Sequence, residues 1–212
     1  MRALDAFDFT DLNIKNDSKI KNWKSEREND IEVILLGEEK VGKTQIINQL
    51  QYKKFNENYT KTLSTNKNCK TIKIEEEENI KSKNLNIYDL PGAKQFRSIN
   101  NTFLKTSNII LLIYDITNFE SFIELYNWNE LLNEKKNILK CVIGNKNDLL
   151  EKREISQEDG KNFADKIEAL FFETNAKDYI KIDDIFTKIV SEYSLFYEKK
   201  KRKRTFNSFK KK

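Results

Sequence analysis

Gly37-Glu38-Glu39-Lys40-Val41-Gly42-Lys43-Thr44 stands between an apolar run and a helical pattern. It fits G-x-x-x-x-G-K-[ST], the phosphate-binding loop. In such a loop, glycines let the backbone wrap closely round phosphates, successive N–H groups point inward, and the following helix presents its positive end. Lys43 would then bridge the outer phosphates, and the Thr44 hydroxyl would hold Mg²⁺. The stretch predicts a phosphate site, the alternative being a plain glycine-bearing turn between a strand and a helix.

The patterns on either side of this loop predict alternating strands and helices. The β-branched run 31–36 is typical of a strand buried on both faces, and a helix is expected over 43–52. We expect further strands over 69–74, 85–88, 108–114, 138–143 and 169–173, a long charged hairpin tip over 75–83, and helices over 119–135, from Ser156, and over 180–197. This order predicts an α/β fold with a mainly parallel sheet covered on both faces, and a phosphate loop belongs at the carboxyl ends of its strands.

The composition limits the functions open to this chain. Its 212 residues suffice for one α/β domain with a full core and tails. It contains no histidine, which excludes histidine-based acid–base chemistry and histidine metal sites. Cys69 and Cys141 are 72 residues apart, so neither a disulfide framework nor a zinc site is indicated. The longest purely apolar run, 109–113, is far short of a membrane span and no signal-peptide core is found, so a soluble intracellular protein is expected.

The charge is divided unevenly along the chain. The net charge is +5, yet residues 199–212 hold nine Lys/Arg and no acid, so residues 1–198 carry 30 basic against 34 acidic residues, a net of −4. We therefore expect a slightly acidic domain over 31–198 without a nucleic-acid-binding face, and a polybasic tail over 199–212. Residues 1–30 are polar and predict a mostly disordered extension, although residues 4–12 could dock on the domain or on a partner.

Polar sequences follow the predicted strands and indicate a guanine site. The strongest is Asn145-Lys146-Asn147-Asp148. A carboxylate at Asp148 could accept hydrogen bonds from N1–H and the exocyclic amine of guanine, whereas adenine presents no such pair of donors. The alkyl stem of Lys146 would lie over the ring, and Asn145 would brace the loops. A polar turn after a strand is the competing interpretation of this tetrapeptide taken alone.

Three other segments would complete the predicted nucleotide site. Glu173-Thr174-Asn175-Ala176-Lys177 could bring a backbone N–H and the Lys177 stem to the base. Asp89-Leu90-Pro91-Gly92 would put a carboxylate in the outer shell of Mg²⁺ and a glycine N–H on the γ-phosphate. Thr62, 18 residues after Thr44, could complete the Mg²⁺ shell, although a threonine in a polar segment is usually only a loop residue.

With these five boxes in order, the chain resembles the Ras superfamily of small GTPases over residues 31–197. It is most similar to the Rab branch, through FNENYTKT at 55–62, FRSI at 96–99, IYDIT at 113–117 and GNKNDL at 144–149. The resemblance implies a six-stranded sheet with five main helices, GTP or GDP and Mg²⁺ as ligands, and switch segments near 53–67 and 90–104 that meet effector and exchange-factor proteins. It implies nucleotide contacts at Glu39, Lys40, Val41, Gly42, Lys43, Thr44, Gln45, Phe55, Thr62, Gly92, Asn145, Lys146, Asp148, Asn175, Ala176 and Lys177, catalytic roles for Lys43, Thr62 and Gly92, and metal contacts at Thr44, Thr62 and, through water, Asp89.

Departures from the family pattern predict weak catalysis. Ala93 stands where the family has the glutamine that orients the attacking water. Losing one such preorganised group costs about 3 kcal/mol in comparable sites, so slow hydrolysis is expected. Glu39 and Lys40 replace the small residues usual in the loop. Glu39 would crowd an incoming arginine finger, and its charge would repel phosphate unless Lys40 pairs with it.

The effector segment and the tail depart as well. Residues 63–67 read LSTNK in place of the Rab pattern IGVDF, and Tyr88 replaces a tryptophan, so general Rab effectors are not expected to bind. The tail has no cysteine for a prenyl anchor. It could be a solvated charge run, a patch for anionic membranes or a nuclear-import signal. The leading hypothesis is a divergent Rab-like switch in vesicle traffic at an endomembrane; the alternatives are a non-hydrolysing GTP-binding scaffold and a nuclear adaptor.

Overall fold

A computed structural model describes residues 30–76, 79–92, 103–132, 135 and 137–209, with side chains up to Lys201. The predicted disordered extension therefore lies outside the described residues, except for Asp30. The same holds for Ala93 and for most of the second predicted switch segment.

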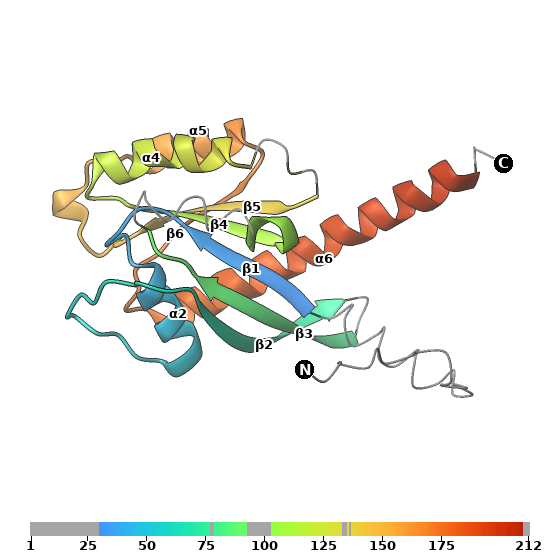
Figure 1. Ribbon diagram of the computed structural model, residues 1–212, viewed down its shortest axis with the longest axis horizontal. Coiled ribbons are helices and arrows are strands. Elements are labelled where there is room, and N and C mark those ends of the chain that lie inside the picture. The colour runs from blue at the N-terminus through green and yellow to red at the C-terminus, as the bar shows by residue number, and fades with distance from the viewer. Residues whose placement is uncertain (1–29, 77–78, 93–102, 133–134, 136, 210–212) are drawn as a thin grey trace, which may run out of the picture.

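The core of the molecule is a six-stranded sheet in the order β2-β3-β1-β4-β5-β6 (Figure 1). Its strands are β1 (Asp30–Leu36), β2 (Asn66–Glu76), β3 (Asn79–Asp89), β4 (Ile109–Asp115), β5 (Leu139–Asn145) and β6 (Leu170–Glu173). Only β2 runs antiparallel to its neighbour, while β3, β1, β4, β5 and β6 pair in parallel. The predicted α/β fold with a mainly parallel sheet is confirmed.

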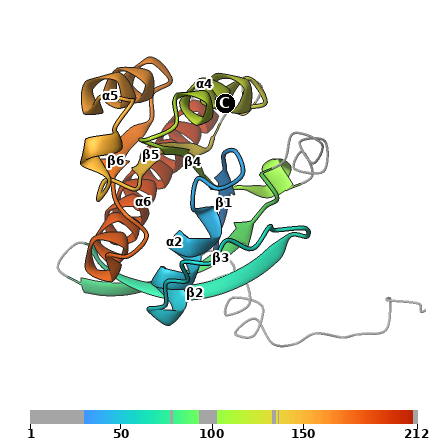
Figure 2. The same ribbon diagram turned by 90° about the vertical axis from the view of Figure 1, so that its left-hand side faces the viewer.

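Helices cover both faces of this sheet (Figure 2). They are α2 (Lys43–Tyr52), α4 (Phe119–Glu130), α5 (Gln157–Lys166) and α6 (Tyr179–Phe209), together with the short 3-10 helix η3 (Leu150–Lys152). One core packs Leu50 of α2 and Phe186 of α6 against the sheet, and the other packs Trp128 of α4 and Phe163 of α5 against the opposite face. All seven residues of β4 are buried, as its continuous apolar run requires for a central strand covered twice.

Helix starts follow the capping rules. The Ser156 hydroxyl accepts the N–H of Asp159 at 3.0 Å, so α5 begins where its sequence predicts. At α4, the Asn118 side chain accepts the N–H of Ser121 at 3.0 Å.

No helix in the described ranges combines the length and apolarity that a membrane crossing needs.

Three predicted boundaries are wrong, and the first is that of the hairpin tip. The hairpin tip is not long, because β2 and β3 stay paired as far as Glu76 and Asn79, and Lys81 and Lys83 lie 2.8 and 3.7 Å from the Glu76 carboxylate. Alternating charge therefore stabilises the ladder instead of ending it.

The helix predicted over 119–135 ends at Glu130, because the backbone changes to a tighter turn in which Leu132 N–H donates to Asn129 O at 2.9 Å. In contrast, α6 does not end near Tyr197 but continues to Phe209. Lysine and arginine are good helix formers, and the stretch contains no glycine or proline to stop it.

Candidate functional site

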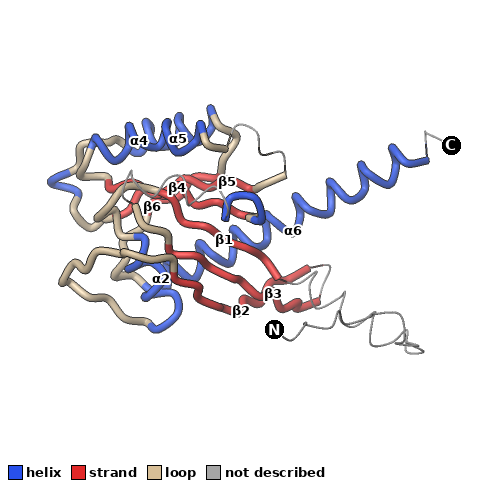
Figure 3. Tube along the Cα trace, viewed as in Figure 1, coloured by secondary structure: helices blue, strands red, loops and turns tan. Residues whose placement is uncertain are grey.

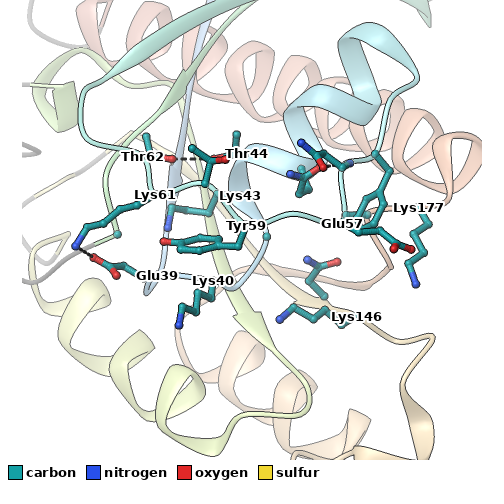
Figure 4. Close-up of a pocket in the computed structure, with 18 of the residues that line it drawn as sticks. Glu39, Lys40, Lys43, Thr44, Glu57, Tyr59, Lys61, Thr62, Lys146 and Lys177 are labelled. Carbon is teal, nitrogen blue, oxygen red and sulfur yellow. Dashed lines mark hydrogen bonds and ion pairs between the residues drawn. The ribbon is translucent and has the colours of Figure 1, made fainter.

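The loops at the carboxyl ends of the strands enclose a cavity of about 390 Å³, within the usual range for small-molecule sites. Figure 3 shows the long connections after α2 and after β5 at this end of the sheet, opposite the protruding end of α6. The cavity is lined by Glu39, Lys40, Gly42, Lys43, Thr44, Gln45, Phe55, Asn56, Glu57, Tyr59, Thr60, Lys61, Thr62, Gly92, Asn145, Lys146, Asp148, Leu149, Ala176 and Lys177, many of which are drawn in Figure 4.

The phosphate loop has the backbone that its motif requires. Gly37 has φ 146°, and a Cβ there would lie 2.2 Å from the carbonyl oxygen of Ile113, so only glycine fits. Lys43 is buried, and its Nζ donates to Gly37 O at 2.9 Å and to Glu38 O at 2.8 Å. Burial lowers the pKa of Lys43 to about 8, against the opposing effect of Asp89 and nearby glutamates. A buried ammonium held in this way gains strongly from an anionic ligand, and phosphate supplies one.

Three oxygen-bearing side chains meet beside this lysine. Thr44 Oγ1 lies 3.0 Å from Thr62 Oγ1 and donates to Asp89 Oδ2 at 2.6 Å. Adjacent ligands of an octahedral Mg²⁺ with bonds of about 2.1 Å are roughly 3.0 Å apart, so the spacing of the two hydroxyls fits that ion. Asp89 is buried, and burial raises its pKa. Within the described structure its Oδ1 has no hydrogen-bond partner, so it can accept from a water bound to the metal.

The end of the cavity predicted to hold the base is built from two loops that brace each other. Asp148 Oδ2 lies 3.0 Å from Lys177 Nζ, and the same ammonium lies 5.6 Å from the centre of the Phe55 ring. Asn175 lies outside the cavity lining; its Oδ1 accepts the Lys177 N–H at 3.0 Å, and its Nδ2 donates to Asn147 Oδ1 at 3.3 Å. The position of Asn175 favours a bracing role over the predicted direct contact.

Asn145 joins this end to the phosphate loop. It is buried at the end of β5, and its Nδ2 donates to Val41 O at 2.7 Å. A Cβ on Gly42, whose φ is 99°, would lie 2.2 Å from the same nitrogen. The side chain of Val41 packs in the core and does not line the cavity. Lys146 lines the cavity, and its ammonium pairs with the Asp115 carboxylate, a contact that the sequence reasoning did not assign.

The structure thus brings most of the sequence-predicted residues to one cavity and adds several that were missed. The added lining residues are Asn56, Glu57, Tyr59, Thr60, Lys61 and Leu149. A signal for the first five was present, because Phe55 and Thr62 were both assigned to the site and the chain between them is short. Leu149 directly follows the assigned Asp148.

Glu39 pairs with Lys61 and not with Lys40, the one partner that the sequence analysis considered for it. Its carboxylate lies 2.8 Å from the ammonium of Lys61, whereas Lys40 has φ 66° and places its ammonium 5.5 Å from the centre of the Tyr59 ring. The reason is geometric: Glu39 and Lys40 are adjacent, and the left-handed backbone at Lys40 turns the two side chains toward different partners.

A comparison with known protein families agrees with this geometry. The model of the Ras family matches residues 32–194, well over half of the chain. The chain belongs to the Ras family. As a Ras-family protein it is a small GTPase, a switch that binds guanine nucleotide and acts through regulators and effectors. The cavity borders the phosphate loop at the carboxyl ends of the parallel strands, where ligands bind in open α/β sheets.

Proposed function

We propose that this Ras-family protein is a Rab-like switch that binds GTP or GDP with Mg²⁺ in the cavity and hydrolyses GTP slowly. The observation that carries the proposal is the 2.7 Å hydrogen bond from Asn145 Nδ2 to Val41 O, which fixes the guanine-selective loop against the phosphate loop. In this arrangement Asp148 accepts from the guanine edge, and Lys146, Ala176 and Phe55 flank the base. Lys43 and the loop N–H groups hold the phosphates.

The metal site of this proposal consists of side-chain oxygens. Thr44 and Thr62 would coordinate Mg²⁺ directly, and Asp89 would bind one of its waters, which agrees with the 3.0 Å spacing of the hydroxyls. When bound, the ion would neutralise charge on the phosphates. Among the described residues, no group of three or more His, Cys, Asp or Glu offers an alternative metal site.

Slow hydrolysis is supported by the sequence after Gly92. Ala93 has no polar side chain with which to orient water, and phosphoryl transfer depends on such positioning. Gly92 lines the cavity, where its N–H would bind the γ-phosphate. Glu39 at the cavity wall would also crowd an arginine finger.

Single-turnover hydrolysis of GTP by the wild type and by Ala93→Gln tests this proposal. We expect the glutamine variant to be faster, on the order of 100-fold, because one preorganised polar group is regained. Equal rates would contradict slow hydrolysis through Ala93, and failure of the purified protein to retain guanine nucleotide would contradict the assignment of the cavity.

We propose Rab character and a role in vesicle traffic because the sequences of segments 55–62, 113–117 and 144–149 resemble those of the Rab branch. Effectors and exchange factors would contact the segments 53–67 and 90–104. Since LSTNK and Tyr88 depart from the Rab pattern, the effectors would be specialised ones. Pull-down with the protein loaded with a non-hydrolysable GTP analogue, compared with GDP, tests for them. A protein that retains GTP without turnover and binds the same partners in both forms would be the alternative scaffold.

We propose that the chain is divided into an extension (1–30), a GTPase domain (31–198) and a basic tail (199–212). For the tail we propose contact with anionic membranes. The support is nine Lys/Arg without an acid in residues 199–212, of which the six at 199–204 belong to the helix that runs to Phe209. Basic helices bind anionic lipid surfaces, with about 1 kcal/mol per charge as an upper bound. Sedimentation with anionic and with neutral liposomes tests this. Binding to neither at physiological salt would contradict it, and loss of nuclear localisation on tail deletion would favour the import signal.

A further inference from the structure

Two side-chain contacts connect the phosphate loop to the segment between α2 and β2. Glu39 Oε1 lies 2.8 Å from Lys61 Nζ, and Lys40 Nζ lies 5.5 Å from the centre of the Tyr59 ring. Figure 4 shows the Glu39–Lys61 pair and the Tyr59 ring beside Lys40 at the cavity. Two neighbouring loop residues thus meet two residues of the segment, so the connection resists rotation as well as separation.

The ion pair lies next to the proposed metal ligands. Lys61 directly precedes Thr62, whose hydroxyl lies 3.0 Å from that of Thr44. A movement of the Lys61 backbone away from the phosphate loop would therefore carry Thr62 away from Thr44. The hydrogen bond to Glu39 raises the pKa of Lys61, which favours the charged form of the lysine. The lysine also compensates the negative charge of Glu39 at a wall of the cavity proposed to hold phosphate.

We infer that Glu39 and Lys61 form a latch that holds the segment 53–62 over the cavity and slows the release of nucleotide. In this inference the role of the two residues is to position Thr62, the residue that follows Lys61. This inference rests on the proposed function of the cavity. Because the latch consists of the chain's own side chains, part of the closure is independent of the γ-phosphate. GDP and GTP should therefore leave the wild type at more similar rates than they leave a variant without the pair.

The size of the effect follows from the exposure of the pair. The side chains of Lys61 and Glu39 are 43 and 31 % exposed, so solvent screens the attraction between them. Loss of such a pair is expected to raise the release rate about two- to fivefold. The direction in which Glu39→Gln changes the rate of GDP release distinguishes the latch from simple repulsion of phosphate. If Glu39 acted only by repelling phosphate, Glu39→Gln would slow the release of GDP, whereas loss of the latch accelerates it.

The first experiment measures the release of a fluorescent GDP analogue from the full-length protein. We expect Glu39→Gln and the double variant to release it at similar, faster rates than the wild type, because the second substitution has no pair left to break. Lys61→Gln should release it at least as fast, because the charge of Glu39 is then uncompensated beside the phosphates. Lys54→Gln, which removes an exposed charge of the same segment outside the cavity lining, is the matched control and should release as the wild type does. Raising the salt from about 0.05 to 0.5 M should reduce the differences. Additive effects, or slower release from Glu39→Gln, would overturn the latch.

The second experiment does not depend on nucleotide. Hydrogen–deuterium exchange of the backbone amides of residues 59–62 should be about two- to fivefold faster in Glu39→Gln than in the wild type and unchanged in Lys54→Gln. Equal exchange in the wild type and Glu39→Gln would contradict the latch. A protein that shows the expected exchange but binds no GDP analogue would support the latch and contradict the proposed function, so the two failures are distinct.

Discussion

Replacing Gly92 by alanine tests how closely the loop after β3 must approach the phosphate loop. A Cβ at Gly92 would lie 2.5 Å from Lys43 Nζ and 2.7 Å from both the carbonyl carbon and the carbonyl oxygen of Glu38. Ordinary contacts to carbon are about 3.5 Å or longer, so the two backbones must separate by roughly 0.8 Å. No rotamer change can relieve the contact with Glu38, because the neighbour is main chain. The separation also strains the hydrogen bonds of Lys43 to Gly37 O and Glu38 O, at 2.9 and 2.8 Å.

Overpacking of this kind costs about 1–3 kcal/mol. If the cost falls on the nucleotide-bound form, GDP affinity should drop roughly 5- to 150-fold. If it falls equally on the free and bound forms, affinity is kept and the melting temperature should drop by about 2–12 °C. Fluorescence titration with a GDP analogue and thermal unfolding of the same preparations separate the two cases.

Gly160→Ala supplies the contrast for this experiment. Gly160 is a buried residue of α5 outside the cavity lining, and a Cβ there would lie 2.3 Å from the Tyr114 hydroxyl oxygen and 2.8 Å from the Phe171 ring. It should lower the melting temperature without changing GDP affinity. Wild-type affinity together with a wild-type melting temperature in Gly92→Ala would refute the reasoning, because the two backbones would then have room that the structure does not show.

Three more changes have expected outcomes. Asp148→Asn should weaken GDP binding by roughly 3 kcal/mol, about two orders of magnitude, because two hydrogen bonds to a charged acceptor are lost. The variant should favour a xanthine nucleotide, whose carbonyl accepts a hydrogen bond from the new amide, and competition titration of the two nucleotides measures this. Asn145→Ala leaves Val41 O, now bonded at 2.7 Å, without its donor and should destabilise the fold by about 1–3 kcal/mol, measured by urea unfolding; an unchanged midpoint would contradict a structural role for this bond. The pKa of Lys43 is lowered from 10.5 to about 8, so between these values the unfolded chain binds more protons and the contribution of this group to stability rises with pH. Affinity for phosphate should fall over the same range as Lys43 loses its proton. Melting curves and GDP titrations should show both slopes more steeply in the wild type than in Lys43→Met.

The sheet and the position of the cavity could be predicted because their signals are local. The run 31–36 followed by G-E-E-K-V-G-K-T predicts a buried strand and a phosphate loop, and parallel strands bring later loops such as 145–148 to the same edge. The structure agrees, with Asn145 at the end of β5 bonded to the loop after β1. Local signals failed where tertiary contacts decide. The charges near Glu76 look like a hairpin tip in the sequence but pair across the ladder in the structure.

The partner of Glu39 could not be predicted for a different reason. Lys61 lies in an irregular segment without periodicity, so no pattern fixes which way its side chain points. Only the path of the backbone between Phe55 and Thr62 brings the lysine to the carboxylate, at 2.8 Å. A neighbour in sequence, Lys40, was the natural choice, and its positive φ excludes it by turning it toward Tyr59.

This pairing changes the argument about catalysis. An unpaired Glu39 would have repelled phosphate, so both weak binding and slow hydrolysis could have been assigned to it. With Lys61 at 2.8 Å the pair is neutral, and electrostatic repulsion of phosphate is no longer expected from this residue. What Glu39 retains is its bulk at the cavity wall and its hold on the segment that carries Thr62. In the proposed function slow hydrolysis then depends on Ala93, and in the proposed latch slow release depends on Glu39 with Lys61, so the two properties should respond to separate substitutions.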